Sequence, residues 1–173
     1  MNRDSPIKPS IARRVYRHWS FRLVLLVLAV LVVRSFQQRG VVEGKAPPLE
    51  GYDLQEEAIS LGQLEGKTVL VHFWATWCGV CRTMADNVQS VSRDHAVIAV
   101  ASQSGSAAEV AAYLEKEGLS LPVLLDPEGT LASDYGVSAL PTSFVIDRSG
   151  RIRSAEVGYT TEIGLRLRLW LAE

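Results

Sequence analysis

The stretch that decides the fold is Phe73-Trp74-Ala75-Thr76-Trp77-Cys78-Gly79-Val80-Cys81. It overlaps the end of an apolar, β-rich run at residues 68–75, which predicts a buried strand. The residues that follow, 80–93, are predicted to form a helix. Both cysteines of the chain therefore stand where a strand ends and a helix begins.

This position predicts redox chemistry. The unpaired N–H groups and the positive dipole end of a helix N-terminus stabilise a thiolate, so we expect a lowered pKa for Cys78 and assign it as the nucleophile. Cys81 lies one turn later on the same helix face, at a Cα separation of about 5–6 Å that suits a disulfide, and is the resolving cysteine. Gly79 leaves the approach to Cys78 open, and Trp77 offers partner proteins an apolar surface.

Metal binding is the alternative use of two nearby cysteines. Zinc needs about four ligands, and the chain has no second cysteine pair and only His18, His72 and His95. Haem attachment needs a histidine directly after the second cysteine, where the chain has Arg82. Copper handling without redox turnover is the stronger rival because thiolates bind Cu(I). Peroxidases of related fold form a further option, although they do not usually need two cysteines at this spacing. We expect no cofactor and no bound metal.

An apolar run at residues 23–33 predicts a membrane anchor. A cleaved signal peptide and a core helix are the alternatives, but residues 33–37 form a poor cleavage site and the run lacks a polar face. Extended to residues 19–36 it has 18 residues, or roughly 27 Å of helix, close to the span of a bilayer. Six Lys and Arg precede the run's core and three follow it before residue 46, which favours a cytoplasmic N-terminus. We therefore expect a basic cytoplasmic tail at 1–18, a signal anchor at 19–36, a linker at 37–48 and an extracytoplasmic domain at 49–173.

The charge distribution agrees with that orientation. The net charge of the 173 residues is −1, but residues 1–46 carry nine Lys and Arg against two acids, and residues 47–173 carry nine against seventeen. A basic head beside an apolar run and an acidic body indicate a membrane-facing head rather than a nucleic-acid surface.

The rest of the chain alternates between strand and helix patterns. Strands are expected at residues 97–101, 121–125, 142–146 and 152–157. Helices are expected from a capping box at Ser106 and Glu109 to Gly118, then at 127–135 and 161–172. This alternation, closed by a hairpin, predicts an α/β fold with a mixed sheet. The last helix carries too many apolar residues for one narrow stripe, so we expect it to be well buried.

The segment 73–81 closely resembles the active site of thioredoxins, in particular the membrane-anchored TlpA/ResA-like branch. The Gly79-Val80 dipeptide and the short anchor resemble the ScsD (suppressor of copper sensitivity) type. Further similarity lies in Leu64-Glu65-Gly66-Lys67 and in Val137-Ser138-Ala139-Leu140-Pro141-Thr142.

The resemblance implies a thioredoxin fold, a central mixed sheet flanked by helices. It implies an oxidoreductase that exchanges disulfides with protein thiols, with Trp77, Gly79, Val80 and Leu140 contacting the substrate. It also implies a cis bond before Pro141, in a loop that faces the two sulfurs. The expected partner is a membrane electron-transfer protein, and the expected location is the inner membrane with the catalytic domain in the periplasm.

Two positions depart from the thioredoxin pattern. His72 replaces a buried acid that assists proton movement at the resolving cysteine. A histidine with a pKa near neutrality fits that role, and a satisfied core histidine fits the position equally well. Val80 replaces a proline in the dipeptide that tunes the redox potential, so the direction of the reaction does not follow from the sequence.

Overall fold

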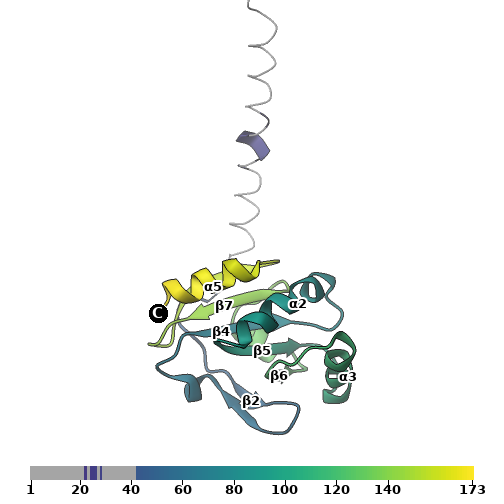
Figure 1. Ribbon diagram of the computed structural model, residues 1–173. Coiled ribbons are helices and arrows are strands. Elements are labelled where there is room, and N and C mark those ends of the chain that lie inside the picture. Colours follow the sequence, from purple (N-terminus) through teal and green to yellow (C-terminus); the bar gives the residue numbers. More distant parts are fainter. Residues whose placement is uncertain (1–21, 23, 27, 29–41) are drawn as a thin grey trace, which may run out of the picture. The chain divides into compact units, whose positions relative to one another are not determined.

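The computed structural model describes residues 22, 24–26, 28 and 42–173 (Figure 1). The chain divides into two units, Met1–Gln37 and Gln38–Glu173. In the first unit, residues 22, 24–26 and 28 are helical. The predicted tail at 1–18 and the rest of the predicted anchor at 19–36 lie outside the described residues. Among the residues with a described structure, no helix combines the length and apolar character needed to cross a membrane.

The second unit is built on a six-stranded sheet in the order β1-β8-β7-β4-β5-β6. Its strands are β1 (Gly44–Lys45), β4 (Val69–Trp74), β5 (Ala96–Ser102), β6 (Val123–Asp126), β7 (Thr142–Ile146) and β8 (Arg151–Val157). The β4–β5 and β5–β6 pairs are parallel, whereas the β4–β7, β7–β8 and β1–β8 pairs are antiparallel. The predicted mixed sheet is confirmed.

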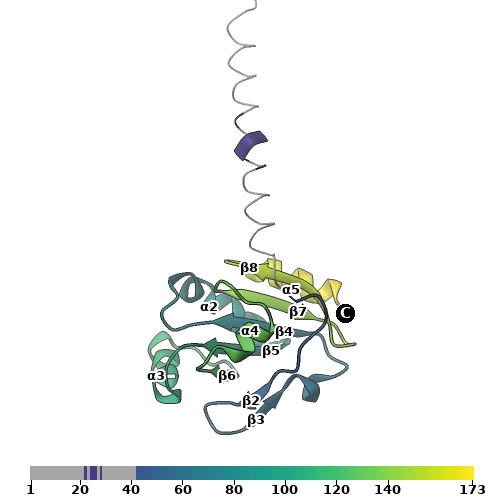
Figure 2. The same ribbon diagram turned by 180° about the vertical axis from the view of Figure 1, so that it is seen from behind.

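Helices cover both faces of this sheet (Figures 1 and 2). The helices are α2 (Gly79–Ser92), α3 (Ala107–Glu117), α4 (Thr130–Asp134) and α5 (Glu162–Leu171). α2, α3 and α5 pack on one face. The other face is covered by α4 and by a second small sheet, β2 (Glu50–Tyr52) with β3 (Ala58–Ser60), which leads into the 3-10 helix η1 (Leu61–Leu64). This arrangement is the predicted thioredoxin fold.

The central strand β4 contributes side chains to both faces. Val71 and Phe73 belong to the core beneath α4, whereas Leu70 packs with α2 and α5. Every residue of β4 is buried, as the continuous apolar run predicted. Since side chains alternate along a strand, His72 shares the face of Leu70 and points toward α2.

The N-terminal part of this unit begins earlier than the sequence indicated. Residues 44–45 form β1, which pairs with β8, although residues 37–48 are predicted as a linker. The hydroxyl of Tyr135 donates a hydrogen bond to the carbonyl of Pro47 at 2.9 Å, and the Ala46 N–H donates to the Gly150 carbonyl at 2.9 Å. Strand pairing and these bonds therefore hold residues 44–48 in the body, and the domain begins before residue 49.

The C-terminal helix α5 is less buried than expected. Leu165 and Leu169 are fully buried against α2 and the sheet. The other four large apolar side chains of the helix face solvent: Ile163, Leu167, Trp170 and Leu171. The prediction of a well-buried helix is wrong because two leucines on one face are enough to fill the space above β4 and β7.

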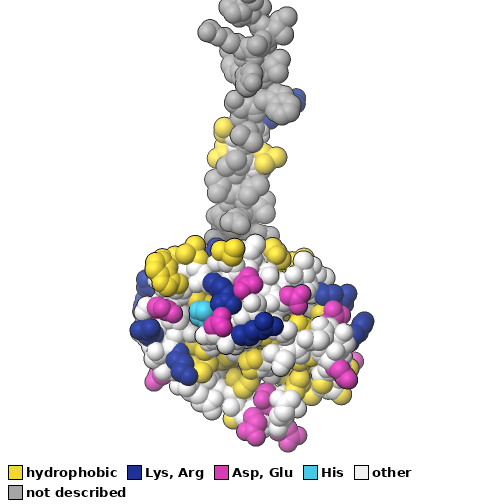
Figure 3. Space-filling model, in the orientation of Figure 1, with side chains coloured by type: hydrophobic (Ala, Val, Ile, Leu, Met, Phe, Trp, Pro, Cys, Tyr) yellow, Lys and Arg dark blue, Asp and Glu magenta, His cyan; other side chains and the backbone are white. Residues whose placement is uncertain are grey.

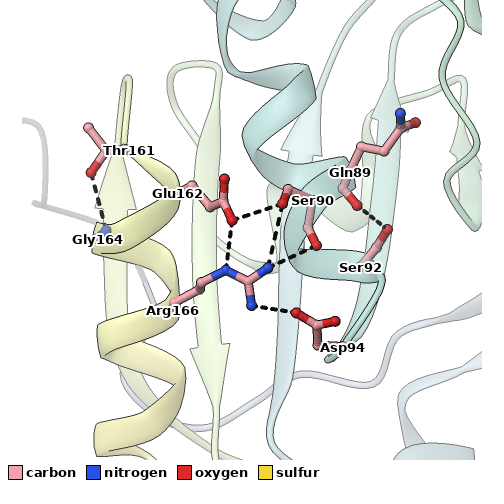
Figure 4. A network of polar contacts seen from close by, with 8 residues as sticks. All are labelled: Gln89, Ser90, Ser92, Asp94, Thr161, Glu162, Gly164 and Arg166. Atoms are coloured by element: carbon pink, nitrogen blue, oxygen red, sulfur yellow. Dashed lines mark hydrogen bonds and ion pairs between the residues drawn. The ribbon is translucent and has the colours of Figure 1, made fainter.

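Polar contacts hold α5 against α2 (Figure 4). The guanidinium of Arg166 donates to the carboxylate of Glu162 at 2.8 Å and to that of Asp94 at 2.6 Å. The Ser90 hydroxyl of α2 also donates to Glu162 at 2.8 Å. Arg166 and Ser90 lower the pKa of the Glu162 carboxyl by hydrogen bonding. These contacts fix the rotation of α5 and so decide which of its faces is left outside.

Candidate active site

Cys78 and Cys81 form a disulfide at the start of α2. Cys78 is the N-cap residue, with φ −86° and ψ 109°, and its sulfur accepts a hydrogen bond from the Cys81 N–H at 3.1 Å. The two Cα atoms lie 5.2 Å apart. Because β4 ends at Trp74, the pair stands at the strand-to-helix junction that the sequence predicted.

The helix end around the sulfurs is electropositive. The first turn of α2 contains no acidic residue, and its free N–H groups and dipole point toward the N-cap. In the reduced pair such a position favours the thiolate over the thiol at Cys78. A thiolate here can attack a disulfide, and the neighbouring cysteine can displace the product.

The two cysteines differ in access. Cys78 is 8% exposed and Cys81 3%. Around Cys78, Trp77 is 65% exposed and Val80 48%. A side chain at Gly79 would meet no atom within 4 Å, so the space outside the helix start is open. A partner protein therefore reaches the pair from the Cys78 side, across an apolar rim.

The loop after β5 supports this rim. The indole N–H of Trp77 donates to the Gln103 carbonyl at 2.9 Å, and the Thr76 N–H donates to the Ser104 hydroxyl at 3.2 Å. Gln103 has φ 49°, a left-handed conformation that aims its carbonyl away from the strand direction. Neither Gln103 nor Ser104 was expected at the site from the sequence. Both residues follow the end of the strand predicted at 97–101, and the carboxyl ends of neighbouring parallel strands such as β4 and β5 meet at one edge of a sheet. Their place after this strand could therefore have indicated that they lie near the cysteines.

His72 is buried beside the pair. It is 2% exposed, and its Nδ1 is hydrogen bonded to the Ser143 hydroxyl at 2.9 Å. Burial lowers the pKa of His72 to about 4. The expectation of a pKa near neutrality is wrong because a charged imidazole loses its hydration in this interior.

A small cavity joins His72 to the resolving cysteine. Its volume is about 10 Å³, and its lining includes His72, Trp74, Cys81 and Tyr113. That volume is close to the space one water needs. The Trp74 indole N–H and the Tyr113 hydroxyl are buried and have no hydrogen-bond partner among the described residues. Side chains from β4, α2 and α3 thus surround the cavity beside Cys81.

The loop before β7 completes the site. The bond Leu140-Pro141 is cis, which confirms the prediction. Leu140 packs on the cluster that contains both cysteines and Trp74. The Pro141 carbonyl accepts a hydrogen bond from the Gly158 N–H at 2.8 Å. The structure therefore brings residues 140–141 to the cysteine pair from a distant part of the chain.

No metal centre is found among the described residues, and His18 lies outside them. Within residues 42–173 and the few described positions before them, no three or more His, Cys, Asp or Glu side chains are grouped to hold a metal ion. Met84, the nearest additional soft ligand in the sequence, is fully buried in the apolar cluster between α2 and α5.

The fold and the disulfide at the helix start define a thioredoxin-like protein with a redox-active cysteine pair. Comparison with protein families agrees, since residues 42–155 match the model of the AhpC/TSA family. The chain belongs to this family.

Relatives narrow the class further. A thioredoxin-like protein of Haemophilus influenzae is 31% identical over 87% of this chain and 91% of its own. The thiol-disulfide oxidoreductase ResA of Bacillus subtilis is 30% identical over 87% of this chain and 88% of its own. Among solved structures, the exposed lipoprotein thioredoxin Etrx1 of Streptococcus pneumoniae superposes with a TM-score of 0.65 at 26% identity, over 72% of this chain and 99% of its own. The chain is a thiol–disulfide oxidoreductase, as predicted.

Proposed function

We propose that the chain exchanges disulfides with protein substrates outside the cytoplasm, with Cys78 as nucleophile and Cys81 as resolving cysteine. The observation that carries this proposal is the position of Cys78. It caps α2, it is more exposed than Cys81, and the open apolar rim of Trp77 and Val80 surrounds it.

The reaction follows from this arrangement. The Cys78 thiolate attacks one sulfur of a substrate disulfide, forms a mixed disulfide and releases the other substrate sulfur as a thiolate, which takes a proton from water. Cys81 then loses its proton and attacks the Cys78 sulfur, which releases the second substrate thiolate. The substrate gains two electrons and two protons, and the Cys78–Cys81 pair is oxidised. The reverse sequence oxidises a dithiol.

Residues 140–141 and the rim complete the proposed docking site. Leu140 packs beside the cysteines, and we propose that its backbone pairs with an extended substrate segment. Trp77 and Val80 provide apolar contact, and Gly79 leaves the approach to the sulfurs unobstructed.

His72 is proposed to take up the proton that Cys81 loses. At neutral pH its imidazole is uncharged, and the side chains of His72 and Cys81 line one cavity. In the tautomer whose Nδ1–H donates to Ser143, Nε2 is the nitrogen that accepts the proton. Because burial makes this imidazole a weak base, it passes the proton on rather than holding it. His72→Gln is expected to slow release of the mixed disulfide while the attack by Cys78 keeps its rate. Stopped-flow measurement of both steps checks this, and equal effects on the two would remove His72 from the mechanism.

Trapping of the intermediate tests the proposed roles. Cys81→Ser should accumulate a mixed disulfide between Cys78 and a disulfide-containing model protein, detected by mass spectrometry under non-reducing conditions. Cys78→Ser is the matched control and should give none. A mixed disulfide through Cys81 in the control variant would reverse the assignment.

The extracytoplasmic location is a second part of the proposal. It is supported by the apolar run at residues 23–33 and its flanking charges. The structural relative described as an exposed lipoprotein also supports it. In spheroplasts, a membrane-impermeant maleimide should label reduced Cys78 in the full chain. Labelling only after lysis would contradict this orientation.

The finer assignment is an ScsD-type oxidoreductase of the inner membrane, reset by a membrane electron-transfer protein. The Gly79-Val80 dipeptide and the apolar run support it. The reduction potential of the pair distinguishes the possible directions. A value near that of thioredoxin, about −270 mV, indicates a reductant, and a value near about −120 mV indicates an oxidant.

A further inference from the structure

Helix α5 carries two opposite apolar faces. Leu165 and Leu169 form the inner face and are fully buried. The outer stripe of α5 consists of Ile163, Leu167, Trp170 and Leu171, which are 79%, 52%, 65% and 67% exposed. Positions spaced by four, seven and eight residues share one side of a helix. Figure 3 shows hydrophobic side chains gathered along the edge of the body that α5 occupies in Figure 1.

The fold does not require the outer stripe. The inner leucines already complete the core between α5, α2 and the sheet, and the contacts of Arg166 fix the rotation of the helix. Large apolar side chains grouped on a surface indicate an interaction site. The stripe therefore needs a covering that lies outside the body.

The stripe is separate from the active site. The Thr68 hydroxyl donates to the carbonyl of Ala172, just after α5, at 3.5 Å. Thr68 precedes the start of β4, whereas the cysteines follow the end of that strand. Trp170 and Leu171 therefore lie toward the opposite end of β4 from Cys78, and a surface that covers them leaves Cys78 open.

The chain enters the body beside this helix. β1 pairs with β8, and Glu156 of β8 accepts a hydrogen bond from Arg168 of α5 at 2.8 Å. The apolar run at 23–33 ends about ten residues before β1, which limits the distance between them to about 35 Å of extended chain. A tether of this length allows the α5 side of an anchored body to meet the bilayer surface.

The chemistry of the stripe fits lipid better than protein. It has three aliphatic side chains and one tryptophan, the aromatic residue that favours the membrane–water interface. The arginines on its flanks, Arg166 and Arg168, are paired with carboxylates of the body, so the affinity for lipid comes from the apolar side chains of the stripe. A stable protein interface buries about 800 Å² on each partner, which is more than the four side chains of the stripe can supply.

We propose that the outer stripe of α5 lies on the lipid surface and holds the body against the bilayer with the Cys78 side free. This inference rests on the proposed membrane anchoring. The contact restricts the orientation of the domain and leaves the redox pair accessible to partner proteins.

Tryptophan quenching in vesicles tests the proposal. The full chain is reconstituted in phosphatidylcholine–phosphatidylglycerol vesicles with brominated acyl chains, which quench only indoles that reach the lipid. The difference in emission between the native chain and Trp170→Phe gives the emission of Trp170. This emission should lose most of its intensity in the brominated vesicles. Trp77 is a matched control because it has the same 65% exposure, and its emission, isolated with Trp77→Phe, should be retained.

The anchor is monitored by Trp19, isolated with Trp19→Phe, and by flotation of the vesicles. If the chain floats with the vesicles and Trp19 is quenched while Trp170 is not, the α5 proposal is wrong and the membrane anchoring still holds. Failure to float overturns the anchoring and, with it, the α5 proposal. Trp170 shielded from both lipid and aqueous acrylamide would indicate a second copy or a partner protein, which also overturns it.

A variant of the stripe provides a second readout. Ile163→Ser combined with Leu167→Ser changes exposed positions only, so far-UV circular dichroism should be unchanged. Loss of most of the lipid quenching of Trp170 in this variant supports the proposal. Unchanged quenching in a folded variant contradicts it.

Discussion

The body has two exposed apolar regions that differ in what lies beneath them. The active-site rim, Trp77 and Val80, stands over a reactive disulfide, and a hydrogen bond to Gln103 fixes its indole. The outer stripe of α5 stands over a completed apolar core. Trp77 and Trp170 are equally exposed, so exposure alone does not distinguish a substrate surface from a docking surface. The groups beneath each surface, a disulfide in one case and an apolar core in the other, distinguish the two.

The largest expected effect separates the two regions by reactivity. Cys78→Ser should lower the rate of protein disulfide reduction by at least about 1,000-fold, the scale seen when a catalytic nucleophile is removed. Changes in the outer stripe of α5 should leave this rate unaltered in detergent. A turbidity assay of protein disulfide reduction measures both. Substantial activity in a folded Cys78→Ser chain would show that the rim does not surround the working sulfur.

A second prediction concerns the buried side of the active-site region. The pKa of His72 is about 4 in the folded chain and 6.5 when unfolded, so between these values the unfolded state binds more protons. Stability should therefore fall as the pH decreases below 6.5, and the loss at pH 5 should be about 2 kcal/mol from this group.

Denaturant unfolding of the full chain in mild detergent at pH 7 and pH 5 measures this loss. His72→Gln is the control, since other titrating groups act equally in both proteins. The native chain should lose about 2 kcal/mol more than the variant between the two pH values. Equal losses would mean that the imidazole is not desolvated as described.

The smallest effect compares the two tryptophans directly. Trp77→Ala should reduce kcat/KM for a protein disulfide by about tenfold, as expected for an aromatic anchor at an interface. Its rate with a small-molecule disulfide should stay the same, because that substrate needs no apolar rim. Trp170→Ala should change neither rate in detergent. A similar loss in both variants would mean that the two regions act as one surface.

Much of this architecture was predictable because local and long-range signals agree. The apolar run of β4, the capping box of Ser106 with Glu109 and the left-handed Gly118 at the end of α3 are all observed. The cysteine pair was predictable because its chemistry depends on the helix start, which is local. The cis bond before Pro141 followed from family resemblance.

The features that were not predicted depend on contacts between residues far apart in the sequence. β2 and β3 are three residues each and form by pairing with one another, without a run long enough to be recognised. The pKa of His72 depends on burial, and its hydrogen-bond partner Ser143 lies opposite it in the β4–β7 register, far along the chain. The exposure of Trp170 depends on the rotation of α5, which Arg166 fixes through residues far along the chain.

The central claim is that the start of α2 holds Cys78 as a reactive thiolate in the reduced chain. Alkylation at pH 7 with a small iodoacetamide, followed by mass mapping, measures it directly in the full protein. Cys78 should react about tenfold faster than a free cysteine, and Cys81 much more slowly than Cys78. Equal rates for the two sulfurs, or a Cys78 rate no higher than that of free cysteine, would contradict the account.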